Sequence, residues 1–239
     1  VDESVTKSGV TAVTAYDKTA RLDKKTSWID TGKAQAPTFP CKMQAVLNYL
    51  CARAGMTTDF TCEDITITNA PDGYTARELI SYIAASHGAN AYVAPNEVLK
   101  IVPYTQVNKT VGHDRCYAMD ISGGDYTVKG ILFDRGGDNK IYIDGTASEY
   151  DADADGIVSA YNPFATVGIA EYAWNRLGGL KYSAASLEMP AENILEVGDV
   201  FTVKDADGTE KKAIVMEQSL SVSSSGGFVE RISCSAESK

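Results

Sequence analysis

Apolar residues recur every three or four positions in two segments of the first half of the chain. The first segment lies between Pro40 and Gly55, and the second lies between Thr75 and Gly88. This spacing places apolar residues on one helix face, and a glycine stands where each helix would end. The sequence therefore predicts two amphipathic helices, with apolar faces formed by Met43, Val46, Leu47, Leu50, Cys51 and Ala54, and by Ala76, Leu79, Ile80, Ile83 and Ala84.

The second of these helices begins with the residues of a capping box. The Thr75 hydroxyl can accept a hydrogen bond from the first turn, while Glu78, three residues later, reaches back to the backbone N–H of Thr75. His87 continues the apolar face of this helix. We therefore expect His87 to lie at the edge of the core.

Strand-like segments flank the two helices. Residues 10–16 are mainly small, β-branched or aromatic, which favours an extended strand. Residues 91–94 and 98–102 are separated by the turn residues 95–97 and predict a hairpin. The first hundred or so residues are thus typical of a mixed α and β region.

The second half of the chain is mostly strand-like. Residues 126–133 and 140–144 are separated by a Gly-Gly-Asp-Asn turn, and a third helix follows Asn162-Pro163. The apolar face of that helix is Val167, Ala170, Ala173, Trp174 and Leu177. Four further strands are predicted over residues 182–189, 199–204, 212–222 and 228–236.

These elements predict an α+β fold with two domains. The first, residues 1–108, is a mixed α/β domain with an N-terminal strand, two helices and a hairpin. The second, residues 109–239, is sheet-rich, a partial barrel with one packed helix near residues 164–178.

Composition narrows the function classes. The 239 residues carry 32 acidic and 22 basic side chains, a formal net charge of −10, which argues against unaided binding to nucleic-acid backbones. The five cysteines form no C-x-x-C pair, which argues against a zinc site or a disulfide framework and favours mostly buried thiols. No apolar run is long enough to span a bilayer.

The order of segments resembles the hub proteins at the tail tip of bacteriophages, a family that includes prophage tail proteins and the N-terminal region of tail-associated lysins. The stretches that carry the resemblance cover most of the chain. They are TAYDKTARLDKKTSW, PCKMQAVLNYLCARAGM, DGYTARELISYIAASHGANAYVAPNEVLKIVPY, NPFATVGIAEYAWNRLGGLKYSAASLEMP and LEVGDVFTVKDADGTEKKAIVMEQSLSVSSSGGFVERISCSAES.

The resemblance implies a structural role in the virion, at the tail tip, for a protein made in the bacterial host cytoplasm. Such proteins form a homotrimeric ring beneath the tail tube, contact distal tail and tail-tube proteins, and leave a channel for the tape-measure protein and DNA. An acidic wall suits such a channel because it repels phosphate. The family carries a further barrel-forming segment before a strand such as residues 10–16, so we expect the chain to be part of a longer protein.

Asp151, Asp153 and Asp155, followed by Gly156, match the first positions of a calcium-binding loop. Asn162 stands where that loop needs a bidentate glutamate, and its neutral amide cannot replace one. The same Asp-Ala-Asp-Gly sequence recurs at residues 205–208 between two strand-like runs, where a turn explains it. We therefore favour an acidic turn and predict no cofactor and no bound metal ion, and we keep calcium binding by the three aspartates as the weaker alternative.

Catalytic motifs are not found around the two histidines, His87 and His113. We therefore predict that the chain is not an enzyme. Trp174 fits the apolar face of its helix, whereas Trp28 lies in a polar segment and is the candidate for an interface contact.

Two alternative functions stay open at this point. The chain could be the non-catalytic part of a tail-associated cell-wall hydrolase or endopeptidase, because related tail proteins often extend into such domains. It could also be a calcium-dependent surface adhesion module, which rests on the three aspartates alone.

Overall fold

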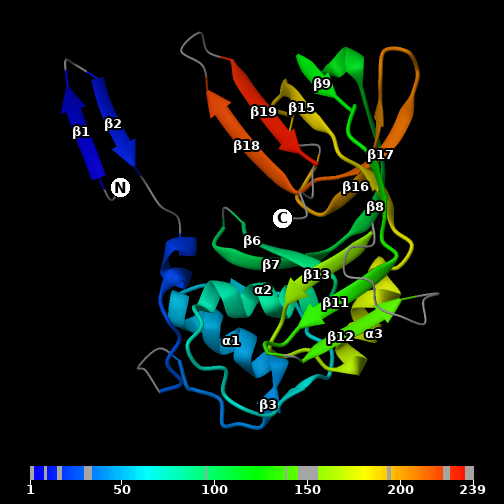
Figure 1. Ribbon diagram of the computed structural model, residues 1–239. Helices are drawn as coiled ribbons and strands as arrows, with labels where there is room; N and C mark the ends of the chain where they lie inside the picture. The colour runs from blue at the N-terminus through cyan, green and yellow to red at the C-terminus, as the bar shows by residue number, and fades with distance from the viewer. Residues whose placement is uncertain are drawn as a thin grey trace. The chain divides into compact units, whose positions relative to one another are not determined.

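The computed structural model describes residues 3–7, 10–14, 18–29, 34–94, 96–137, 139–144, 156–192, 195–222 and 227–234. The chain forms two compact units (Figure 1). Unit 1 comprises Val1–Ile83 and Ala91–Ile101, and unit 2 comprises Ala84–Asn90 and Val102–Lys239. Helices and several small sheets occur together, which confirms the predicted α+β fold class.

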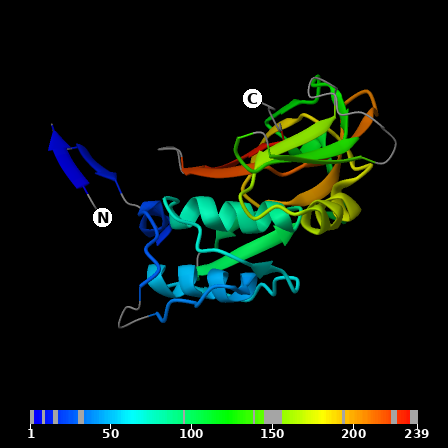
Figure 2. The same ribbon diagram turned by 60° about the horizontal axis from the view of Figure 1, so that its bottom comes forward.

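Unit 1 holds two helices and the strands around them. Its elements are β1 (Glu3–Lys7), β2 (Val10–Thr14), η1 (Lys18–Asp23), β3 (Cys41–Lys42), α1 (Met43–Ala54), β4 (Thr57–Thr58), β5 (Thr66–Ile67), α2 (Ala76–Ser86), β6 (Ala89–Val93) and β7 (Val98–Pro103), with the ends of α2, β6 and β7 reaching into unit 2. The strands pair as β1-β2, as β3-β5 and as β4-β7-β6. Figures 1 and 2 show α1 and α2 alongside one another.

Both predicted helices of the first half are confirmed, and their predicted apolar faces are buried except at Ala76, which is half-buried in the first turn of α2. All six predicted apolar positions of α1 are buried, and Gly55 ends the helix in the left-handed conformation, φ +71°. In α2 the buried positions are Leu79, Ile80, Ile83, Ala84 and, at its last residue, Ser86. The predicted hairpin is confirmed as β6 and β7, with the Ala94 N–H donating to the Val98 carbonyl.

The capping box at the start of α2 is also confirmed. The Thr75 N–H donates to Glu78 Oε2 at 2.7 Å, and the Glu78 N–H donates to Thr75 Oγ1 at 3.2 Å. These bonds hold the pKa of Glu78 below its usual range, chiefly through the backbone N–H of Thr75. Two N–H groups at the helix start thereby gain acceptors.

Removing this cap gives a first prediction. Thr75→Ala is expected to lower the free energy of unfolding of unit 1 by about 1 kcal/mol, because the first turn loses an acceptor. Thr75→Ser keeps the hydroxyl and is expected to behave like the unchanged chain. Urea denaturation followed by circular dichroism measures both, and equal losses for the two variants would contradict the capping role.

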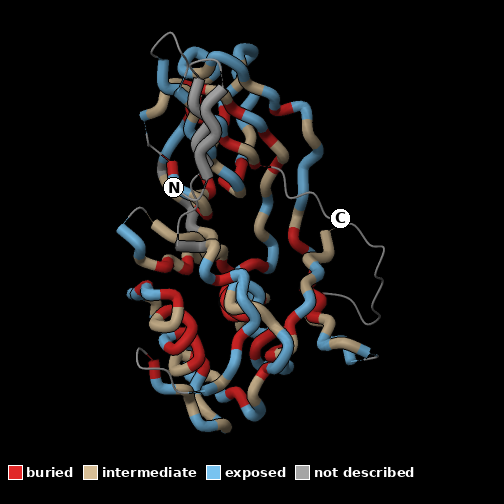
Figure 3. Tube along the Cα trace, turned by 90° about the vertical axis from the view of Figure 1, so that its left-hand side faces the viewer, coloured by how far each residue is buried: buried red, intermediate tan, exposed pale blue. Residues whose placement is uncertain are grey.

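Unit 2 contains most of the strands and one α-helix. Its further elements are β8 (Thr105–Gly112), η2 (His113–Arg115), β9 (Ala118–Asp120), β10 (Asp125–Thr127), β11 (Gly130–Asp134), β12 (Lys140–Asp144), β13 (Ile157–Tyr161), α3 (Val167–Leu177), β14 (Lys181–Ser183), β15 (Ser186–Pro190), β16 (Asp199–Lys204), β17 (Glu210–Ile214), β18 (Glu217–Val222) and β19 (Phe228–Ser233). Buried and exposed residues are interspersed along these strands (Figure 3).

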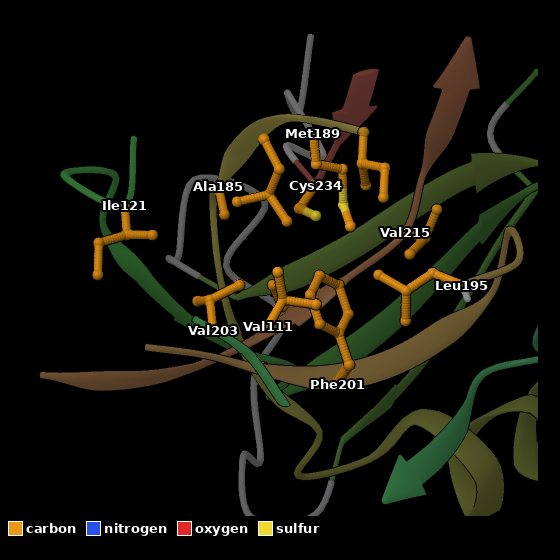
Figure 4. Close-up of a cluster of buried hydrophobic side chains, with 12 residues drawn as sticks. Val111, Ile121, Ala185, Met189, Leu195, Phe201, Val203, Val215 and Cys234 are labelled. Atoms are coloured by element: carbon orange, nitrogen blue, oxygen red, sulfur yellow. The ribbon is translucent and has the colours of Figure 1, made fainter. Parts of the chain in front are cut away.

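Two sheets of unit 2 contribute to one hydrophobic core. A four-stranded antiparallel sheet has the order β18-β19-β15-β9, and a three-stranded sheet has the order β17-β16-β8. Figure 4 shows this core, whose side chains come from strands of the two sheets and from residues outside them: Val111, Ile121, Ala185, Leu187, Met189, Leu195, Phe201, Val203, Ala213, Val215, Ile232 and Cys234. Among the described residues none of the sheets closes into a barrel.

A third sheet, β12-β11-β13, packs with α3. Ile169, Ala170, Ala173 and Leu177 form the buried face of α3. The prediction that Val167 belongs to this face is wrong, because its side chain is 59% exposed at the first turn of the helix. Trp174 is half-buried and covers Gly178, where an added Cβ would lie 2.7 Å from the indole ring.

Three predicted strands are in fact pairs of strands. Residues 126–133 divide into β10 and β11, residues 182–189 into β14 and β15, and residues 212–222 into β17 and β18. At each break the chain leaves one sheet and joins another. The residues at the breaks can themselves be buried and apolar, as Ala185 and Val215 are. The apolar pattern therefore runs on through each break and does not reveal it.

The described part of the chain also contains strands that the pattern did not predict. They include β1, β8, β9 and β13. Residues on both sides of position 108 belong to the single strand β8. The predicted boundary between domains 1–108 and 109–239 therefore falls within β8, and this division stays a prediction that differs from the two compact units.

Candidate assembly surfaces and predicted site residues

The aspartates of the calcium-loop hypothesis, Asp151, Asp153 and Asp155, lie outside the described residues. The glycine that follows them is described. Gly156 has φ +92°, and a Cβ there would lie 2.2 Å from the Thr127 carbonyl oxygen. Its own carbonyl accepts from the Lys129 N–H at 2.8 Å. Close backbone approach therefore explains the glycine without a metal ion.

The second Asp-Ala-Asp-Gly sequence, residues 205–208, forms the predicted turn between β16 and β17. The Asp205 N–H donates to the Thr209 carbonyl at 2.9 Å, and Asp207 Oδ1 accepts from the Thr209 N–H at 2.8 Å. That last bond lowers the pKa of Asp207. Here both aspartates serve the geometry of a hairpin.

No group of three or more His, Cys, Asp or Glu side chains among the described residues lies close enough to hold a metal ion. The close backbone approach at Gly156 and the neutral amide of Asn162 in place of a bidentate glutamate favour a turn over a calcium loop. On these grounds we predict that millimolar calcium leaves the melting temperature unchanged, because a ligand raises it only by binding the folded state. Differential scanning calorimetry in calcium and in excess chelator measures this. A clear rise that Asp153→Asn removes would support the calcium alternative.

The two histidines lie in different environments of unit 2. His87 is buried after the end of α2 and packs edge-on against Tyr172, with 5.7 Å between ring centroids. His113 is exposed at the first position of η2. His87 is almost completely buried, which is typical of a side chain with a packing role. The sequence predicted such a role for it at the edge of the core.

Trp28 has several partners inside unit 1. Its ring stacks on Tyr49 of α1 with 5.4 Å between centroids and meets Phe39 edge-on at 5.2 Å. Its Nε1–H donates to the Pro71 carbonyl at 3.1 Å. The indole is half-buried and anchors its segment to α1, and its role as an interface contact stays a prediction.

The five cysteines are free thiols in the structure, as predicted, and three of them are buried. Burial raises the pKa values of Cys51, Cys62 and Cys234 to about 12, and Cys51 adds a smaller contribution at Cys62. Cys41 and Cys116 are half-buried, and burial raises their pKa values as well.

Thiolate reactivity follows from this arrangement, because the thiolate is the form that attacks a disulfide reagent. At pH 8 the folded chain is expected to react with Ellman's reagent only slowly, and only at Cys41 and Cys116. In denaturant all five thiols should react at once. Peptide mapping after alkylation identifies the sites, and rapid labelling of Cys51 or Cys234 in the folded chain would contradict the prediction.

One surface feature was missed from the sequence. Three of the exposed large apolar side chains lie on the β18–β19 hairpin: Leu220, Val222 and Phe228, 59%, 63% and 57% exposed. Val222 and Phe228 are direct cross-strand partners, and Leu220 lies two residues before Val222 on the same face. We call these three residues the apolar strip. Their spacing of two was the available signal, although it is equally typical of a core strand.

The apolar strip continues the core-facing side of its sheet. Ile232 lies on the same face of β19 as Phe228 and is buried in the hydrophobic core. Between them lies Glu230, 1% exposed, whose Oε1 accepts from the side-chain amide of Gln218. Its Oε2 has no hydrogen-bond partner among the described residues.

In the part of the chain that is described, no helix combines the length and apolar character of a membrane span.

Two small sheets of unit 2 thus share a hydrophobic core, and one hairpin exposes three neighbouring apolar side chains. Neither the protein-family models nor the sequences of curated proteins give a match to this chain. Among solved structures, the 43 kDa tail protein of prophage MuSo2 from Shewanella oneidensis is similar, with a TM-score of 0.59 and 14% identity, over 98% of this chain and 76% of that one.

A tail protein from Neisseria meningitidis MC58 is similar with a TM-score of 0.51 and 14% identity, over 86% of this chain and 70% of that one. The chain therefore has the fold of phage and prophage tail proteins, as the resemblance of its sequence implied. At such low identity the likeness concerns the fold alone.

Proposed function

We propose that this protein is a structural component of a phage or prophage tail tip and forms part of a trimeric hub ring below the tail tube. The observation that carries the proposal is the likeness to the MuSo2 tail protein, which extends over 98% of the chain. A likeness over nearly the whole chain gives stronger support than a shared single motif, because both units and their order are included.

The proposed partners follow from this position. They are two further copies of the chain, the distal tail and tail-tube proteins, and the tape-measure protein and DNA that pass through the channel without specific binding. The net charge of −10 supports the last point, because like charges keep phosphate from adhering to a channel wall. The protein would reside at the tail tip of the virion.

The proposed role involves assembly and no reaction of the chain's own. The surroundings of the two histidines support it, since His87 is buried against Tyr172 and His113 is exposed on η2. The thiols offer no activated nucleophile, because burial raises the pKa values of all five.

Mass in solution tests the proposal. Light scattering is made on the 25.6 kDa chain and on a version extended upstream by the barrel-forming segment that the resemblance implies. The extended protein is expected to have three times its own chain mass at high protein concentration, and negative-stain images should show rings. If both forms stay monomeric at every concentration, or form a twofold dimer, the hub ring is contradicted. Hydrolysis of purified peptidoglycan by the chain would instead support the cell-wall hydrolase alternative.

A further inference from the structure

The apolar strip has the properties of a contact surface. Leu220, Val222 and Phe228 gather at one end of a single hairpin, on the side of the sheet that elsewhere faces the core. β18 is also an edge of the four-stranded sheet in the described part of the chain. Its sequence, EQSLSV, contains no lysine, arginine or proline, which are the residues that usually protect an edge from pairing.

Glu230 supplies a second, independent observation. Glu230 is 1% exposed, and its cross-strand partners are Leu220 in β18 and Met189 in β15. Gln218 donates to Oε1, whereas Oε2 has no partner among the described residues. A buried polar atom without a partner is costly, so a hydrogen-bond donor that arrives with a partner would stabilise the pair.

The opposite edge of the same sheet carries complementary groups. β9 is that edge, and it follows Tyr117, which is 66% exposed, and Arg115, which is also exposed. The Arg115 guanidinium lies 3.7 Å from the Glu192 carboxylate. An exposed aromatic ring beside a cation complements an apolar strip beside a carboxyl group that lacks a donor.

We propose that the apolar strip binds the β9 edge of a second copy of this chain, with Tyr117 against Leu220, Val222 and Phe228 and with Arg115 donating to Oε2 of Glu230. Because Glu230 is buried, this contact requires the side chains around it to move, among them the exposed Leu220 opposite it in β18. The contact joins two different patches, so it is heterologous and repeats around a closed ring. The inference rests on the proposed hub ring and identifies its subunit contact.

Surface variants test the contact by sedimentation velocity. Leu220→Ser and Phe228→Ser are each expected to raise the protein concentration for half-assembly about tenfold, because apolar burial between copies is lost. Val167→Ser is the matched control, since Val167 is as exposed as Leu220 but lies on α3. Assembly of the two strip variants as readily as the unchanged chain would overturn the inference, as would equal loss in the control.

Glu230→Gln separates assembly from folding. Glutamine keeps an oxygen acceptor for Gln218 and is a neutral amide of nearly the same shape, which costs less to bury than a carboxylate, so the melting temperature of the dilute, dissociated chain is expected to rise. The same change removes the acceptor for Arg115, so assembly is expected to weaken. If Glu230→Gln raises the melting temperature and leaves assembly unchanged, Glu230 plays no part in the contact and the proposal fails as stated.

A mixing experiment identifies the two patches as partners. One variant carries Leu220→Ser with Phe228→Ser, and the other carries Arg115→Ala with Tyr117→Ser. Each retains one patch, so the equimolar mixture is expected to form pairs of twice the 25.6 kDa chain mass, whereas each variant alone stays monomeric. A mixture that stays monomeric overturns this contact. An unchanged chain that assembles neither as it is nor in the extended form contradicts the hub ring itself, so the two failures are distinguishable.

Discussion

Replacing Phe201 by alanine is expected to lower the free energy of unfolding of unit 2 by about 3–5 kcal/mol. Phe201 is 1% exposed in the middle of β16, and its ring lies among the inward side chains of both core sheets (Figure 4). Alanine would remove the ring and leave a cavity that the flanking strands cannot close without breaking their pairing. Its cross-strand partner, Ala213, is too small to fill the space.

Fluorescence of Trp174 during urea denaturation, in a Trp28→Phe background, reports the unfolding of unit 2. Phe201→Leu keeps most of the volume and is expected to cost less than about 1.5 kcal/mol. Val167→Ala removes exposed apolar atoms and should change the free energy by no more than about 0.5 kcal/mol. A Phe201→Ala loss as small as that of Val167→Ala would contradict the assignment of Phe201 to the centre of the core.

The helices were predictable from the sequence because their signals are local. A spacing of three and four residues, a capping pair such as Thr75 and Glu78, and a glycine at the end all lie within a short stretch of chain. The membership of strands in sheets has no such signal. β17 and β18 follow one another almost directly, with the buried Val215 between them, yet they belong to different sheets.

The candidate surfaces were less predictable for a related reason. Leu220 and Val222 alternate as core residues do, and only the tertiary structure shows that this end of the hairpin is exposed. Trp28 lies in a polar segment of the sequence, but its ring packs against the rings of Phe39 and Tyr49, which are distant in the sequence. Such non-local contacts are fixed by packing, which the local pattern does not contain.

Asn162 illustrates the same limit most clearly. In the sequence it is the residue that fails the last position of a calcium loop and precedes the third helix. In the structure its side chain is fully buried and makes two hydrogen bonds: Nδ2 donates to Ser86 Oγ at 2.9 Å, and Oδ1 accepts from the Phe164 N–H at 3.0 Å. Asn162 thereby joins the end of α2 to the turn before α3.

Asn162→Ala is therefore expected to lower the free energy of unfolding of unit 2 by about 3 kcal/mol. The buried Phe164 N–H loses its side-chain acceptor, the Ser86 hydroxyl loses a donor, and each loss costs about 1–3 kcal/mol. Urea denaturation in the Trp28→Phe background measures the change. Ser159→Ala, at an exposed position of β13, is the control and should have little effect.

A double-mutant cycle separates the Asn162–Ser86 bond from the effect of the cavity. Ser86→Ala alone is expected to cost about 1 kcal/mol, and the double variant less than the two single losses together, because both remove the same bond. The coupling energy should therefore be about 1 kcal/mol. Additive losses would mean that Asn162 stabilises only the turn through the Phe164 N–H, and a loss below about 0.5 kcal/mol for Asn162→Ala would contradict both contacts.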